Sequence, residues 1–245
     1  MIEDSVIYHH RVDAASVPVD MDETYRYMGF ARSVVLGKDG GIPQDIQQLV
    51  ASCVQQMHST LKAQSVYTCL PLEIDFPAET SEKATDSART EVTTESAGEE
   101  RAETLPLIKI GSIQFESKYL ARNLAGCSKV ILIASTIGPL ADNLIRRFTK
   151  LDAAKAAIMQ AAGAMFIESY LDGFNAQLEK EAEEQGYKLH SRFSPGYGDV
   201  SLEIQRHFFS ILPCTQRIGL TLTDSLVMAP EKSVTAFIGM EPMVQ

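Results

Sequence analysis

The spacing of apolar residues divides the chain into helical and extended segments. Between residues 42 and 62, apolar side chains recur in steps of three and four, the period of an amphipathic helix, and Pro43 suits its first turn. Asp152 can cap the longest helix, whose second half, EKEAEE, is a solvated face. The same rules predict further helices over 118–125, where Ser117 is the cap and Gly126 the end, and over 140–148.

Extended segments alternate with these helices. Residues 128–134, SKVILIA, form a near-continuous apolar run typical of a buried strand. Further strands are predicted at 65–75, 105–110 and 187–192, and as a pair within 218–240 with a turn at Pro230. Because the elements follow no regular βαβ repeat, we expect an α+β fold: a mixed or antiparallel twisted sheet with flanking helices.

One segment differs in composition from its surroundings. Residues 77–104 contain no Ile, Leu, Met, Phe or Tyr, and eight acidic residues stand against three basic ones. Such a segment buries too little apolar surface to offset its ordering entropy, so we expect a disordered acidic insertion. The rest of residues 1–245 is expected to form a single domain.

Composition and charge exclude several functions. Apolar residues make up 45% and charged residues 22% of the chain, as in soluble globular proteins. No apolar run reaches the length of a membrane span, and the N-terminus lacks the positive charge of a signal peptide, so we expect a cytoplasmic protein without a membrane partner. The net charge of -10, without a Lys/Arg cluster, argues against nucleic-acid binding.

Common catalytic and metal-binding motifs are missing. The sequence contains no GxGxxG, GxxxxGK[ST], HExxH or GxSxG motif, which argues against dinucleotide, P-loop, zincin and serine-hydrolase sites. Cys53, Cys69, Cys127 and Cys214 form no CxxC pair and lie at no metal-ligand spacing from a histidine. We expect reduced, mostly buried thiols, no metal and no catalytic residues.

The residue choices in the segment 192–199, RFSPGYGD, favour a ligand-binding turn. Pro195 and Gly196 suit a type II turn, because proline fixes φ at the second position and glycine supplies a positive φ at the third. Bare main chain at the glycines could accept a flat ligand. Arg192 offers a planar fork to a carboxylate, and Tyr197 offers an aromatic face and a hydroxyl group. The alternative is an ordinary strand-to-helix loop, with Asp199 or Ser201 capping a helix over 202–212.

Two motifs in this part of the chain resemble the activation domain of cobalamin-dependent methionine synthases, in its stand-alone form. Arg192, Gly196 and Tyr197 match the RxxxGY motif of that family, with Pro195 before the glycine. Residues 219–230, GLTLTDSLVMAP, then match its G-x-x-L-T-[ED]-S-x-x-M-x-P pattern. Including weaker similarity upstream, the resemblance covers residues 115–239 and implies the activation-domain fold.

The resemblance implies that S-adenosylmethionine is the ligand. Arg192 would hold its methionine carboxylate, and the main chain of Pro195, Gly196 and Tyr197, next to Ser194, would hold adenine. Glu168, on the long helix, would face the cationic end of the ligand; alternatively, it is a solvated or ion-paired helix residue. The N-terminal aspartate with which the family holds the amino group has two candidates, Asp20 and Asp22.

The resemblance also implies a role in reactivation. A corrinoid carried by a partner, either a methionine synthase subunit or another corrinoid methyltransferase, would be reduced by flavodoxin or ferredoxin and remethylated from S-adenosylmethionine. The chain would thus supply the ligand-binding component of a methyltransferase, with cobalamin coming from the partner. Two other functions stay open: a non-catalytic module that docks on a corrinoid protein, and a binder of another nucleoside-like ligand.

Overall fold

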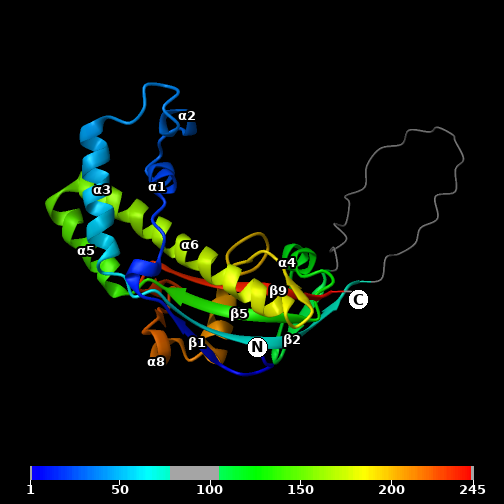
Figure 1. Ribbon diagram of the computed structural model, residues 1–245. Coiled ribbons are helices and arrows are strands. Elements are labelled where there is room, and N and C mark those ends of the chain that lie inside the picture. Colours follow the sequence, from blue (N-terminus) through cyan, green and yellow to red (C-terminus); the bar gives the residue numbers. More distant parts are fainter. Residues whose placement is uncertain (1, 78–104, 244–245) are drawn as a thin grey trace, which may run out of the picture.

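The computed structural model describes residues 2–77 and 105–243 (Figure 1). The acidic insertion expected at 77–104 therefore lies, except for Pro77, outside the described residues.

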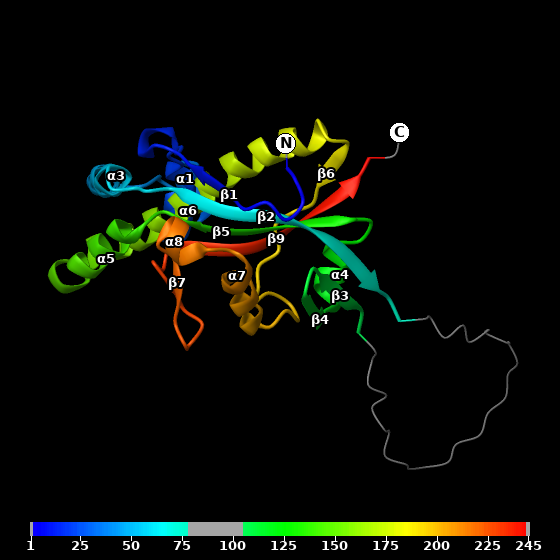
Figure 2. The same cartoon turned by 90° about the horizontal axis from the view of Figure 1, so that it is seen from below.

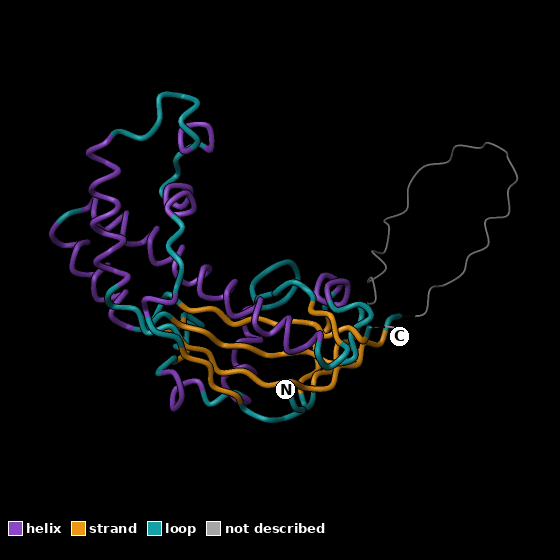
Figure 3. The backbone as a smooth tube through the Cα atoms, in the orientation of Figure 1, coloured by secondary structure: helices purple, strands orange, loops and turns teal. Residues whose placement is uncertain are grey.

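A seven-stranded antiparallel sheet forms the centre of the molecule (Figure 3). Its strands are β1 (Tyr8–Arg11), β2 (Gln64–Asp75), β3 (Leu107–Ile110), β4 (Ile113–Glu116), β5 (Lys129–Thr136), β6 (Tyr187–Leu189) and β9 (Ser233–Pro242). They lie in the order β4-β3-β2-β5-β9-β6, and β1 pairs with the first half of β2. A separate hairpin joins β7 (Thr221–Leu222) to β8 (Met228–Ala229). The α+β fold with an antiparallel sheet is confirmed.

Helices cover both faces of the sheet (Figure 2). One face packs against α6 (Ala153–Glu183), and α1 (Met21–Tyr27), α3 (Gln44–His58) and α5 (Pro139–Leu151) pack in turn against α6. The other packs against α4 (Lys118–Asn123), the 3-10 turn η2 (Leu202–Ile204), α7 (Gln205–Ile211) and α8 (Cys214–Ile218). Two short elements, η1 (Ala14–Ser16) and α2 (Arg32–Val35), flank α1. Among the described residues, no helix is both long and apolar enough to cross a membrane.

The central strand β5 explains why both layers form. After Lys129 all of its residues are buried. Ile131 and Ile133 belong to the core beneath α6, whereas Val130 and Leu132 belong to the core beneath α7. Because successive side chains point to opposite faces, a continuous apolar run requires cover on both sides.

The long helix α6 lies close to the start of β9. Asp152 caps it, as predicted, by accepting a hydrogen bond from the amide of Lys155. At Gly163 an added Cβ would lie 2.9 Å from Cε of Lys232, so the aliphatic stem of that lysine occupies the space where other residues carry a side chain. The absence of a side chain at Gly163 therefore lets Lys232 lie against α6.

Three segments differ from the sequence-based expectation. The strand predicted at 187–192 ends at Leu189. The expected strand at 105–110 belongs to a hairpin whose second strand, β4, was not predicted. Ser201 caps η2 by accepting a hydrogen bond from the amide of Glu203. Asp199, the other candidate for that cap, instead accepts a hydrogen bond from the hydroxyl of Ser117.

Candidate functional site

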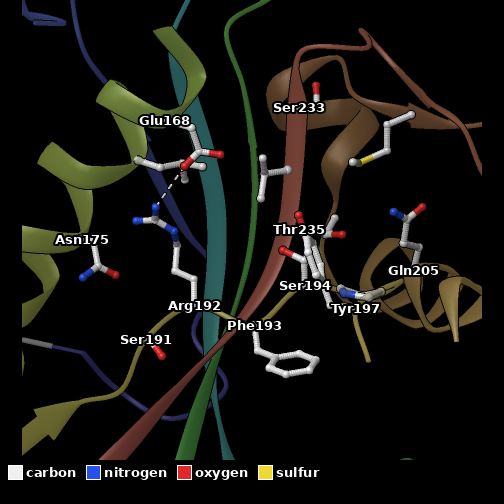
Figure 4. Close-up of a pocket in the computed structure, with 14 residues that line it drawn as sticks. Glu168, Asn175, Ser191, Arg192, Phe193, Ser194, Tyr197, Gln205, Ser233 and Thr235 are labelled. Atoms are coloured by element: carbon white, nitrogen blue, oxygen red, sulfur yellow. Dashed lines mark hydrogen bonds and ion pairs between the residues drawn. The ribbon is translucent and has the colours of Figure 1, made fainter. Parts of the chain in front are cut away.

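A cavity of about 680 Å³ lies at the outer edge of β9, between α6 on one face of the sheet and α7 on the other (Figure 4). We call it the edge cavity. Its walls come from α6, the segment after β6, the first residue of α7, β8 and the start of β9: Glu168, Leu171, Asn175, Ser191, Arg192, Phe193, Ser194, Pro195, Tyr197, Gln205, Met228, Ser233, Val234 and Thr235.

The cavity exists because the sheet edge is left incomplete. β6 pairs with β9 only at residues 240–242, and Phe193 forms one further bridge to Phe237. Pro195 follows two residues later. Since proline has no N–H to donate to a neighbouring strand, pairing ends there and the first residues of β9 have no neighbour on this side within the described chain.

The turn at Pro195 has the predicted geometry. The amide of Tyr197 donates to the carbonyl of Ser194 at 3.3 Å, and Gly196 has φ +91°, as a type II turn requires. The Gly196 amide donates to the carbonyl of Val200 at 2.9 Å. The Gly196 and Tyr197 amides are therefore used inside the loop, whereas no main-chain donor to the Pro195 carbonyl is seen within the described residues.

Asp199 anchors this loop to a distant part of the chain. Its carboxylate accepts hydrogen bonds from the hydroxyl of Ser117 at 2.5 Å and from the amides of Lys118 at 2.6 Å and Tyr119 at 3.3 Å. Partial burial acts to raise the pKa of Asp199, but these hydrogen bonds to the charged form outweigh it and lower the pKa. Asp199 thus caps α4, together with Ser117, and ties the turn to it.

Arg192 lies in the edge cavity within an ion-pair network. Its Nη2 donates to Glu168 at 3.2 Å and to Asp172 at 2.8 Å, both on α6. The Arg192 side chain is 21% exposed and that of Glu168 is 42% exposed. Both bonds use the same nitrogen, so within the described residues Nη1 and Nε remain available to a further acceptor. Glu168 is therefore both ion-paired and cavity-lining.

The structure brings together most of the residues singled out in the sequence. Glu168, Arg192, Ser194, Pro195 and Tyr197 line the edge cavity. Gly196 is not among the lining residues. Its role is to shape the turn, where an added Cβ would lie 3.2 Å from Cδ1 of Leu202.

The two aspartate candidates lie elsewhere. Asp20 caps α1 by accepting from the amide of Glu23 at 2.8 Å, and Asp22 lies in the first turn of that helix. Neither lines the edge cavity; with Glu23 and Arg26 they line a separate hollow of about 340 Å³.

Among the polar lining residues that were not singled out in the sequence, three have a buried side-chain atom without a partner in the described chain. They are Asn175, Gln205 and Thr235, and within the described residues Asn175 Oδ1, Gln205 Oε1 and Thr235 Oγ1 are buried without a hydrogen-bond partner. Gln205 is 5% exposed and Thr235 2% exposed. Asn175 could have been found, because it lies on the helical stripe of Glu168 and Leu171. Gln205 and Thr235 carried no such signal.

The described part of the chain contains no group of three or more His, Cys, Asp or Glu side chains that could hold a metal ion. All four cysteines are free, and all but Cys127 are fully buried, as expected. Burial raises the pKa of Cys69 and of Cys214 to about 12.

Comparison with known proteins identifies the family. The profile of the family described as "Vitamin B12 dependent methionine synthase, activation domain" matches residues 119–245, just over half of the chain. The chain belongs to this activation-domain family. The matched region of the activation domain contains all the residues that line the edge cavity.

A solved structure supports the fold of this activation domain. The chain is similar to the structure described as the MetH reactivation domain bound to AdoHcy, with a TM-score of 0.63 and 14% identity. The similarity covers 100% of this chain and 81% of the other. Comparison of the sequence with curated proteins gave no match. The resemblance seen in the two sequence motifs is thus confirmed.

Proposed function

We propose that this activation domain binds S-adenosylmethionine in the edge cavity and presents its methyl group to the reduced corrinoid of a partner protein. The observation that carries the proposal is the set of buried, unpaired polar atoms on Asn175, Gln205 and Thr235, beside a charged cluster in the same cavity. Buried polar atoms without partners are rare in folded proteins, and a polar ligand is one explanation for a group of them.

The charge of the cavity matches this ligand. Arg192 carries one positive charge, and its partners Glu168 and Asp172 carry two negative charges. S-adenosylmethionine carries a carboxylate, an ammonium and a sulfonium group, so its net charge is positive. The cluster of Arg192, Glu168 and Asp172 has a net negative charge, although Asp172 does not line the cavity. It attracts such a molecule, and the guanidinium of Arg192 orients its carboxylate.

Each residue then has a binding role. Arg192 holds the carboxylate through its free Nη1 and Nε donors, and Glu168 lies beside the cationic end. The turn formed by Ser194, Pro195, Gly196 and Tyr197 borders the nucleoside, with the Tyr197 ring as a stacking surface. The aspartate candidates Asp20 and Asp22 are left out, because neither lines the cavity.

The chemistry requires alignment more than proton transfer. When bound, the sulfonium supplies a methyl group to the Co(I) corrinoid of a partner, which is itself the nucleophile and needs no acid or base from this chain. The corrinoid comes with a methionine synthase or another corrinoid protein, and flavodoxin or ferredoxin supplies the electron that restores Co(I). We further infer that residues 1–245 act as one domain, since both cores share one sheet.

Calorimetric titration tests the proposal. We expect S-adenosylmethionine to bind more tightly than S-adenosylhomocysteine, which lacks the sulfonium charge. Glu168→Gln should remove most of this difference, and Arg192→Gln should weaken both ligands about tenfold or more. Arg206→Gln is the matched control, because Arg206 pairs with Glu203 and does not line the edge cavity.

The possible results separate the candidate functions. Absence of heat with either ligand at millimolar concentration rejects S-adenosylmethionine binding. In that case, capture of a corrinoid protein by the domain would indicate a docking module, and binding of other nucleosides would indicate a different ligand. Equal effects of Arg192→Gln and Arg206→Gln would place the ligand outside the edge cavity.

A further inference from the structure

The main chain of β9 at Thr235 faces the edge cavity. Phe237 exchanges two hydrogen bonds with Phe193 across the outer edge, at 2.9 and 2.8 Å. The carbonyl of Gly239 accepts from the amide of His190 on the same side, at 2.9 Å. Main-chain groups alternate in direction along an antiparallel strand, so those of Thr235, two residues before Phe237, also point outward.

Even-numbered residues of β9 confirm this alternation. The carbonyl of Met240 accepts from Ser128, and that of Lys232, just before β9, accepts from Ile137, so both point toward β5. Thr235 lies opposite Ala134 in the register of β5 and β9. Its N–H and C=O groups are therefore both turned away from β5.

Pro195 keeps these two groups unpaired. If the pairing of Phe193 with Phe237 continued, the residue opposite Thr235 would be Pro195. Proline has no N–H for the Thr235 carbonyl, and the turn at Gly196 then leads the chain away from the sheet. An adjacent donor and acceptor thus remain at the edge, and no main-chain partner for them is seen in residues 105–243.

Side chains place further unpaired polar groups beside the N–H and C=O groups of Thr235. Gln205 reaches the same cavity from the start of α7, and its Oε1 is unpaired; Thr235 Oγ1 is unpaired as well. Figure 4 shows Gln205 on the α7 side of β9, and Glu168 and Asn175 on the α6 side. The uncharged polar groups at Thr235 and Gln205 therefore stand apart from the ionic cluster of Glu168 and Arg192.

We propose that the open edge of β9 at Thr235, together with Gln205, is a base-recognition site for a planar heteroaromatic ring that carries a donor next to an acceptor. Adenine has this pattern, since its amino group lies beside the ring acceptors N1 and N7. The Thr235 carbonyl accepts from the amino group, and the Thr235 amide donates to the ring nitrogen. This proposal rests on the proposed function and assigns the determinant of base specificity to the sheet edge.

Base-modified ligands and amide exchange test this site. S-inosylhomocysteine carries a carbonyl in place of the amino group and should bind about 10- to 100-fold more weakly than S-adenosylhomocysteine, because the Thr235 carbonyl loses its donor. In ¹⁵N-labelled protein, the Thr235 amide should become protected from hydrogen exchange when S-adenosylhomocysteine is bound. Gln205→Met should weaken S-adenosylhomocysteine about tenfold, whereas Gln47→Met, on the surface of α3, should not.

The outcomes distinguish this inference from the proposed function. If S-adenosylhomocysteine binds but S-inosylhomocysteine binds equally well and the Thr235 amide stays unprotected, the base-recognition site is wrong and the proposed function stands. If neither S-adenosylmethionine nor S-adenosylhomocysteine binds, both fail. Arg192→Gln should leave the preference for adenine over hypoxanthine unchanged; a loss of that preference would move base recognition to the ionic cluster.

Discussion

Replacement of Asp199 by asparagine probes how the cavity-lining turn is held in place. In the protein, Oδ1 accepts from Ser117 and Tyr119, and Oδ2 accepts from the amide of Lys118. Asparagine can keep the first oxygen, but its NH₂ group would face the Lys118 amide, donor against donor. The variant also loses a negative charge at the N-terminus of α4.

The expected loss of stability follows from these contacts. A capping hydrogen bond contributes about 1 kcal/mol, and a carboxylate at a helix N-terminus about 0.3–1 kcal/mol. Asp199→Asn should therefore lower the free energy of unfolding by about 1.5 kcal/mol, which shifts Tm by roughly 3–6 °C in a chain of this size. Affinity for S-adenosylhomocysteine should fall as well, because the turn loses its anchor.

The pH dependence gives a second, independent measurement. Hydrogen bonding lowers the pKa of Asp199 from its ordinary value of 3.8, so its stabilising effect is complete above that value and disappears as the pH falls through the lowered pKa. Thermal melts of both proteins should differ by a constant amount from pH 7 to about pH 5 and converge below about pH 4.

A matched control separates the anchor from a general charge effect. Asp45 lies in the first turn of α3, and within the described residues the N-terminus of this helix has no side-chain capping hydrogen bond. Asp45→Asn should change Tm by less than half as much. If both variants behave alike, or if the difference caused by Asp199→Asn persists unchanged at pH 3, the anchoring role of Asp199 is refuted.

Three further predictions concern local structure. Gly196→Ala should lower the free energy of unfolding by about 1–2 kcal/mol in chemical denaturation, because φ is +91° at this position. The control Gly173→Ala lies in α6 with open space around it and should be neutral or stabilising. Equal effects of the two substitutions would contradict the turn assigned at Gly196. Tyr170→Phe should lower the free energy of unfolding by about 1–3 kcal/mol, because the Tyr170 hydroxyl is hydrogen-bonded to Ser65 and His10. An unchanged denaturation midpoint would argue against these two hydrogen bonds. Cys69 and Cys214, with pKa values raised to about 12, should resist alkylation by iodoacetamide at pH 8 until the protein unfolds, and rapid labelling of either would contradict their burial.

Local patterns in the sequence predicted much of the fold. The helix that became α3 and the strand that became β5 followed from apolar spacing, and the caps at Ser117 and Asp152 were read directly from residue type. These features depend on neighbours within a few positions along the chain. The turn at Pro195 and Gly196 was predictable for the same reason.

Long-range partners could not be obtained in this way. The sequence offered Asp199 as a cap of the helix that follows it, because only its neighbours in sequence were considered. In the structure its carboxylate binds Ser117, 82 positions away. The open edge of β9 depends on which strand stops beside it, and no pattern within β9 records that β6 ends at Leu189. Thr235 and Gln205 look like ordinary strand and helix residues until the sheet order is known.

The packing of Gly163 against Lys232 lets the start of β9 lie close to α6 beside the edge cavity. One and two turns further along α6 lie Glu168 and Leu171, which form a wall of the edge cavity, and Ser233, next to Lys232, forms the opposite wall. An added Cβ at position 163 would displace the flexible side chain of Lys232, which lies next to these walls. A substitution at Gly163 can therefore act on the cavity through Lys232, although Gly163 itself does not line the cavity.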